Sequence, residues 1–254
     1  MYDFTPQKKM YLVADKILKT LGIEKYALGG GTALSAHYWQ HRYSTDIDIF
    51  LFEEKSYISD IRNILSNDII TKALKRIGYK GALKFPGHYL EIEIDTDKKI
   101  QFFETPHHHA NGYIQTTLWN KRQVKIETID EIIYKKLFYR AQKGNARDIF
   151  DIAVAIHNNP SLFEGFNLPS TILPSFIIAL QTLVSEEELT KNYNQEIQRI
   201  SPALDYMTIA YNALPYVIDY VTAYVYLKER NAFLGEEDLC ALEAEIYTKQ
   251  ILKN

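Results

Sequence analysis

The sequence of 254 residues predicts an α+β protein with a helical C-terminal part. Between residues 20 and 127, short β-forming runs end in glycine and aspartate turns and alternate with helical patterns. From residue 160 onward, only helical spacing of apolar residues remains. We therefore expect a domain of strands and helices over residues 1–157 and a helical bundle over residues 158–254.

The composition is that of an ordinary globular protein. The chain is 46% hydrophobic and 24% charged, and its apolar runs are too interrupted for a membrane span. Its single cysteine, Cys240, excludes an internal disulfide framework and is typical of a reducing compartment. The first ten residues mix polar and apolar types, unlike a secretory leader. We therefore expect a cytoplasmic protein without a membrane partner.

The periodicity of apolar residues predicts each element of the first domain. Residues 6–21 have helical spacing, and Gly22 is a stop signal. The next expected elements are a strand at 26–28, a helix at 32–40, a strand at 47–52, a helix at 58–77, and two or three antiparallel strands within 79–105, with turns at Gly87 and at 95–98.

Two further helices lead into the C-terminal domain. Thr128 can cap a helix over residues 128–140, because Glu131 completes a capping box with it. A second helix is expected over residues 146–156. Beyond these, we expect helices separated by turns near Pro169, Pro202 and Pro215.

A glycine turn and an aspartate pair carry the most informative chemistry. The run Gly30-Gly31-Thr32 lies between an expected strand and an expected helix, where backbone N–H groups can hold a phosphate. Asp46 and Asp48 alternate in a β-forming run, so their carboxylates share a face. Two such carboxylates repel each other unless a cation lies between them, and oxygen ligands suit Mg²⁺. Together, the two features predict transfer of a nucleotidyl group.

A second cluster lies downstream. Lys136 can place a point charge against a triphosphate oxygen. Asp148 and Asp151 lie three residues apart on the next expected helix, and one of them can orient this lysine or act as a general base toward an acceptor hydroxyl. The alternative is a surface Lys–Asp pair between two packed helices. Residues 121–147 also hold eight basic residues against three acids. This excess favours either a polyanion site or a solvated helix face.

Three runs resemble a known family. GGGTALSAHYWQHRYSTDIDIF, TIDEIIYKKLFYR and NARDIFD, in this order, are similar to the AbiEii-type nucleotidyltransferase toxins of abortive-infection and type IV toxin–antitoxin pairs. This family is related to the polymerase-β-like nucleotidyltransferases. The resemblance covers roughly residues 20–155. It implies a mixed β-sheet flanked by helices, a helical domain after it, and Mg²⁺-dependent transfer of an NMP from an NTP. Some family members act on the 3′ end of tRNA.

The resemblance also implies which residues form the site. The residues it assigns to the nucleotide are Gly30, Gly31, Thr32, Arg42, Ser44 and Lys136. Asp46 and Asp48 are assigned to the metal ion. The residues assigned to catalysis are Asp46, Asp48, Lys136 and Asp148. Arg42 and Ser44 either contact the triphosphate or brace the metal loop. For a third metal carboxylate the candidates are Glu91, Glu93 and Asp95, and we choose Glu93 at the middle of their acidic face. Whether one or two metal ions bind stays open.

The expected reaction is in-line attack by an acceptor hydroxyl on the α-phosphorus of an NTP. The expected partners are the NTP, an RNA (tRNA included) or protein acceptor, and a cognate antitoxin. Two alternatives stay open: a nucleotide- or RNA-binding module of the same fold without turnover, and an antibiotic-modifying nucleotidyltransferase. The sequence does not determine the base of the NTP, the acceptor or the oligomeric state.

Overall fold

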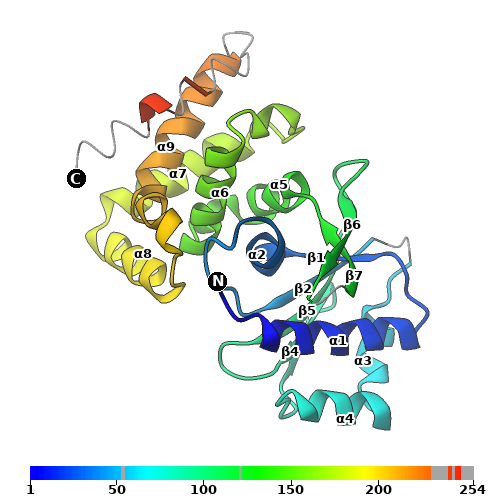
Figure 1. Ribbon diagram of the computed structural model, residues 1–254. Coiled ribbons are helices and arrows are strands. Elements are labelled where there is room, and N and C mark those ends of the chain that lie inside the picture. Colours follow the sequence, from blue (N-terminus) through cyan, green and yellow to red (C-terminus); the bar gives the residue numbers. More distant parts are fainter. Residues whose placement is uncertain (53–54, 120–121, 230–239, 242–243, 247–254) are drawn as a thin grey trace. The chain divides into compact units, whose positions relative to one another are not determined.

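The computed structural model describes residues 1–52, 55–119, 122–229, 240–241 and 244–246 (Figure 1). The chain divides into two compact units, residues 1–131 and residues 132–254. The division lies ahead of the domain boundary expected after residue 157. The reason is that helix α6 (Ala146–Asn158) packs against helices α8 (Glu187–Arg199) and α9 (Met207–Glu229) of the second unit.

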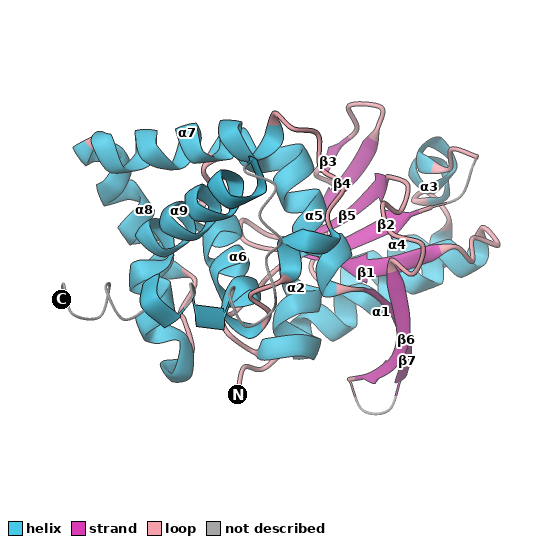
Figure 2. Cartoon of the chain, turned by 90° about the horizontal axis from the view of Figure 1, so that it is seen from above, coloured by secondary structure: helices cyan, strands magenta, loops and turns pink. Residues whose placement is uncertain are grey.

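The first unit is a seven-stranded mixed sheet with helices (Figures 1 and 2). The strand order is β3-β4-β5-β2-β1-β7-β6. β1 pairs in parallel with β7, and β2 with β5, while the other neighbours are antiparallel. Its elements are α1 (Thr5–Thr20), β1 (Tyr26–Gly29), α2 (Gly30–Ala33), the π-helical turn η1 (Leu34–Trp39), β2 (Ile47–Leu51), α3 (Ile58–Ile64), α4 (Asp68–Arg76), β3 (Leu83–Lys84), β4 (Tyr89–Glu93), β5 (Lys99–Glu104), β6 (Tyr113–Leu118) and β7 (Arg122–Glu127).

The core of this unit lies around the central strands. β1 and β2 are buried along their whole length, as expected for strands with elements on both sides. Helix α1 packs against α3 and α4 and against β2 and β5, and α3 packs against β4 and β5. Helix α2 contacts β1 and β2. The mixed sheet flanked by helices, which the resemblance implied, is confirmed.

Two expected helices differ in detail. The helix expected over residues 58–77 is two helices, α3 and α4, because Asn67 caps a new start and accepts a hydrogen bond from Ile69 N at 3.0 Å. The helix expected over residues 32–40 begins earlier, at Gly30, and continues as η1. A π-helical turn adds a residue to each hydrogen-bonded ring, which no apolar spacing in the sequence indicates.

The second unit is helical, as expected for the C-terminal part. α5 (Ile129–Arg140) begins at the end of the first unit and continues into this one. The remaining elements are the short 3₁₀ turns η2 (Ala141–Lys143), η3 (Leu162–Gly165) and η4 (Leu204–Tyr206), and helices α6, α7 (Ile172–Ser185), α8 and α9. Helices α6 to α9 form a bundle, in which α9 packs against α6, α7 and α8.

Helix α9 contains buried tyrosines and an internal proline. Tyr216, Tyr220 and Tyr224 are buried, and the Tyr224 hydroxyl donates to the Phe163 carbonyl at 2.9 Å. The turn expected near Pro215 does not form among the described residues around it, because α9 continues through this proline. Packing of α9 on its neighbours compensates for the backbone hydrogen bond that a proline cannot donate.

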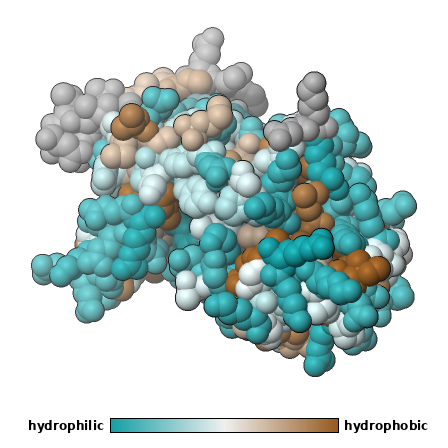
Figure 3. Space-filling view, turned by 60° about the horizontal axis from the view of Figure 1, so that its bottom comes forward, coloured by the Kyte–Doolittle hydropathy of each residue, from teal (hydrophilic) through white to brown (hydrophobic). Residues whose placement is uncertain are grey.

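None of the described helices is long and apolar enough to cross a membrane. Figure 3 shows the hydrophobic atoms on one face as separate patches among hydrophilic ones.

Candidate active site

The glycine turn joins the end of β1 to the start of α2 (Figure 1). Gly30 has a φ of +63°, a left-handed conformation that other residues rarely adopt. A Cβ atom at Gly30 would overlap the carboxylate of Asp48, and one at Gly31 would overlap the guanidinium of Arg42. The turn therefore requires glycine because charged side chains lie directly against its backbone.

The aspartate pair lies beside this turn. Asp48 in β2 is the register partner of Gly29 in β1, and Asp46 immediately precedes β2. Ile47 and Ile49 are fully buried, and Asp48 is 9% exposed. The alternation inferred from the sequence is thus present in the structure. The expected phosphate turn and the expected metal-binding strand come together, and the Asp48 carboxylate lies over the backbone of the turn.

The loop before Asp46 is held by buried polar side chains. The Thr32 hydroxyl donates to the Asp46 carbonyl and is hydrogen-bonded to the Ser44 hydroxyl at 2.9 Å. Gln7 on α1 donates its Nε2 to the Ser44 carbonyl, also at 2.9 Å. Arg42, only 3% exposed, donates to the carbonyl of the next residue at 3.2 Å. Of the two roles expected for Arg42 and Ser44, these contacts favour bracing of the loop.

Gln7 is a residue that the sequence analysis missed. It is fully buried and lies on α1 at positions i−3 and i−7 from the buried Met10 and Ala14. A polar residue on the apolar stripe of a helix is a signal that could have found it, because a buried amide requires hydrogen-bond partners.

The structure does not bring Glu93 to the aspartate pair. β5 lies between β2 and β4, so the acidic strand is not the neighbour of Asp48. The Glu93 carboxylate is 2.7 Å from Lys84 Nζ, and the hydrogen bond from this lysine lowers the pKa of Glu93 below its usual value. Asp95 pairs with Lys98 at 2.6 Å. Within the residues that the structure describes, no three histidine, cysteine or acidic side chains are grouped to hold a metal ion.

The donor atoms that are present fit one hard divalent cation. Asp46 and Asp48 offer carboxylate oxygens from the same face of one strand end. Because Gly30 has no side chain, the backbone of the turn lies against the Asp48 carboxylate. The N–H groups expected to bind phosphate and the oxygens expected to bind a metal ion are therefore close together.

The second expected cluster lies within the second unit. Lys136 Nζ contacts Asp148 Oδ1 and lies 2.9 Å from Asp151 Oδ2, and Arg140 Nη1 lies 3.5 Å from Asp148 Oδ2. Lys136 and Asp148 are each 7% exposed, and Asp151 is fully buried. The cluster is therefore an internal network between α5 and α6 and not a surface pair. Both acids that the sequence placed three residues apart, Asp148 and Asp151, thus face Lys136.

The charges in this network decide what Asp148 can do. Burial is the largest influence and opposes ionisation of its carboxyl. The positive charges of Lys136 and Arg140, with the hydrogen bond from Lys136, outweigh burial and lower the pKa of Asp148 below its usual value. A carboxylate with a lowered pKa is a weak base, so the network favours orientation of Lys136 over proton abstraction.

The basic stretch is largely compensated within the protein. Arg122 is ion-paired with Asp15, Lys125 donates to the Glu24 carbonyl at 2.7 Å, and Lys136 faces its two aspartates. Lys121 lies outside the described residues. Part of the local excess of positive charge in the sequence therefore serves contacts within the protein.

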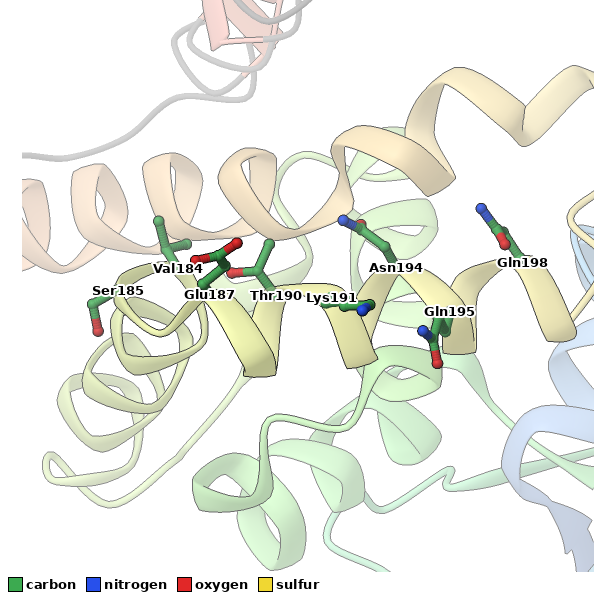
Figure 4. A pocket seen from close by; sticks show the side chains of 8 residues that line it. All are labelled: Val184, Ser185, Glu187, Thr190, Lys191, Asn194, Gln195 and Gln198. Carbon is green, nitrogen blue, oxygen red and sulfur yellow. The ribbon is translucent and has the colours of Figure 1, made fainter.

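A cavity of about 640 Å³ lies between the end of α7 and the exposed face of α8 (Figure 4). Its lining includes Lys191, Asn194 and Gln198, and none of the predicted site residues. The candidate site is therefore the glycine turn with its aspartates, and not this cavity.

Comparisons with known proteins agree with this chemistry. The family described as "Nucleotidyl transferase AbiEii toxin, Type IV TA system" matches residues 12–206. The crystal structure of JHP933 from Helicobacter pylori is 14% identical over 100% of both chains, with a TM-score of 0.48. MenT4, a nucleotidyltransferase toxin from Mycobacterium tuberculosis, is 10% identical over 94% of this chain and 93% of its own, with a TM-score of 0.43.

ANT(2″)-Ia in complex with adenylyl-2″-tobramycin is 16% identical over 76% of this chain and 99% of its own, with a TM-score of 0.36. No curated protein matches. The family match spans more than half of the chain and includes the glycine turn, the aspartate pair and the Lys136 network. The chain therefore belongs to the AbiEii nucleotidyltransferase toxin family of type IV toxin–antitoxin systems, and it is a nucleotidyltransferase.

Proposed function

We propose that this protein transfers an NMP from an NTP to a hydroxyl group of an RNA acceptor, in a reaction that requires Mg²⁺, as the toxin partner of an antitoxin. The observation that carries this proposal is the contact of the Asp48 carboxylate with the backbone of Gly30. It joins a phosphate-binding turn to a metal-binding strand end. Membership of the AbiEii family supports the toxin role and the NTP substrate.

The first unit supplies the groups for the nucleotide. We assign a phosphate oxygen to the N–H groups at the start of α2, because Gly30 and Gly31 have no side chains and the first N–H groups of a helix lack backbone acceptors. Asp46 and Asp48 would hold the metal ion, which when bound neutralises charge on the phosphate oxygens. Thr32 and Ser44 keep Asp46 in place through the loop.

The second unit supplies a positioned cation in this proposal. The ammonium of Lys136 has three N–H donors, and Asp148 and Asp151 each receive one. The role that the family resemblance implies for Lys136 is contact with the triphosphate, where its charge would stabilise the leaving pyrophosphate. Asp148 and Asp151 are then positioning residues for Lys136.

A labelling assay tests the proposal. The purified protein, with Asp48→Ala and Asp97→Ala as variants, is incubated with each α-³²P-NTP, Mg²⁺ and either total RNA or a protein lysate. Asp97 is an exposed acid and serves as the matched control. We expect label in RNA with the wild type and Asp97→Ala, and none with Asp48→Ala or with EDTA.

The other outcomes are informative. Label that persists in Asp48→Ala would remove this residue from the reaction. Label only in protein would replace the RNA acceptor. Nucleotide binding without label in either acceptor would favour the binding module, and label on an added aminoglycoside would favour an antibiotic-modifying enzyme.

A further inference from the structure

We propose that the nucleotidyl-transfer site binds a single divalent cation, because β5 presents Gln101 and Lys99 where a second cation would need a carboxylate. This inference rests on the proposed function and deepens it. It concerns the strand that the structure places next to Asp46 and Asp48, which the sequence did not identify.

The register of the sheet places these side chains. β2 and β5 are parallel, and Asp48 is the register partner of Gln101, as Ile47 is of Ile100. Asp46 precedes Ile47 and Lys99 precedes Ile100, so the same register brings Lys99 opposite Asp46. Register partners on neighbouring strands point to the same face. An amide and an ammonium therefore stand beside the two aspartates.

The amide of Gln101 is held in a defined orientation. Its Nε2 donates to Glu91 Oε2 at 2.8 Å, toward β4 and away from β2. A side-chain amide has one nitrogen and one oxygen, and the nitrogen is thereby fixed on the β4 side. The oxygen remains a neutral ligand of the kind that hard cations accept. Gln101 can thus complete the coordination of one ion without the negative charge that a second ion requires.

The nearby carboxylates are bound to other partners. Glu91 is 4% exposed and accepts from Lys84 at 2.8 Å and from Gln101, with Lys99 at 3.5 Å. Glu93 faces Lys84 at 2.7 Å. Both acids lie on β4, one strand beyond the neighbour of the aspartate pair. Their ion pairs with the two lysines hold them there.

Lys99 adds an electrostatic reason. Its ammonium lies on the strand next to Asp46, and a second divalent cation at that position would be repelled by it. Its ammonium lies 3.5 Å from Glu91 Oε2, and its side chain is 33% exposed. Lys99 thus adds positive charge to the strand beside the aspartate pair, which opposes the binding of a second cation.

The test counts bound Mn²⁺ by titration and electron paramagnetic resonance. The full-length protein is studied with Mn²⁺ alone and with the α,β-methylene analogue of each NTP. We expect one Mn²⁺ per chain beyond that bound to free nucleotide, with the spectrum of an isolated ion. Gln101→Glu should recruit a second Mn²⁺, about 3.5–4 Å from the first, and give a spin-coupled spectrum. The control Gln123→Glu, at an exposed position of β7, should leave the count at one.

Lys99→Gln is the second variant, in case Gln101→Glu fails to fold. Loss of the ammonium should tighten Mn²⁺ binding by about tenfold, because metal affinity follows the charge of the site. Two coupled ions in the wild type, or unchanged binding in both folded variants, would overturn the single-cation inference and leave the transferase proposal intact. Undiminished Mn²⁺ binding by Asp48→Ala would instead overturn the metal site itself.

Discussion

Substitution of Gly30 by alanine separates two reasons for a glycine in the turn. Gly30 and Gly22 have nearly the same conformation, with φ of +63° and +68°. An alanine at either position carries a left-handed strain of about 1–2 kcal/mol. At Gly22, no described atom lies within 4 Å of the added Cβ, whereas at Gly30 this atom overlaps the Asp48 carboxylate. Gly22→Ala is therefore the matched control for strain alone.

The magnitudes follow from this geometry. The strain should lower the melting temperature of Gly22→Ala by about 2–8 °C, given roughly 2–4 °C per kcal/mol for a chain of this size. Gly30→Ala should lose at least as much. In addition, the added Cβ atom would lie 2.0 Å from Asp48 Oδ2, so this carboxylate must move by about 1.4 Å to reach ordinary contact at 3.4 Å. A displacement of about 1 Å already costs about a hundredfold in rate.

The assay compares NMP transfer by the two variants at a temperature where both are folded, as judged by circular dichroism. Gly22→Ala should keep the wild-type rate, and Gly30→Ala should lose most of it. If Gly30→Ala transferred NMP as fast as Gly22→Ala, contact between Asp48 and the turn would not matter for the reaction.

Two further predictions concern the internal network of the second unit. Lys136→Met should destabilise the protein by about 3–5 kcal/mol in chemical denaturation, because it removes the ammonium that faces the buried carboxylates of Asp148 and Asp151. A loss no larger than that of Lys143→Met, at an exposed position, would contradict this. The pKa of Asp148 is lowered in the folded protein, so its contribution to stability is complete above the ordinary value of 3.8 and disappears as the pH falls below it. Acid titration should therefore show that the stability difference between the wild type and Asp148→Asn shrinks below about pH 4, and a difference independent of pH would refute the ionised state.

The local elements could be predicted because their causes are local. Helix α1, strands β1 and β2, and the hairpin of β4 and β5 follow from apolar periods of 3.6 and 2 and from turn residues. The break between α3 and α4 was missed, since the apolar period continues across it and only the Asn67 cap marks the new start. The π-helical turn after Ala33 has no periodic signal of its own.

The order of strands could not be predicted because it depends on contacts far apart in the sequence. From the sequence, Glu91 and Glu93 lie on a strand that follows the aspartate pair, and their alternation favours a metal role. The parallel pairing of β2 with β5 instead inserts Lys99 and Gln101 between these acids and Asp48. Residue types alone favour carboxylates over an amide as metal ligands. Gln101 could therefore be placed beside Asp48 only from the register of β2 and β5.

The three glycines at residues 29–31 explain why this short run marks both the fold and the site. At each, the position of a Cβ atom is taken by a charged side chain from another part of the first unit. Glu127 of β7 lies over Gly29, Asp48 of β2 over Gly30, and Arg42 of the connecting loop over Gly31. β1 lies between β2 and β7 in the sheet, so the carboxylate of Asp48 lies on one side of the glycine backbone and that of Glu127 on the other. A larger residue at any of these positions would displace a charged side chain of the protein itself, whether or not a phosphate is bound. A loss of activity on substitution of these glycines can therefore result from a displaced charged side chain as well as from a lost phosphate contact.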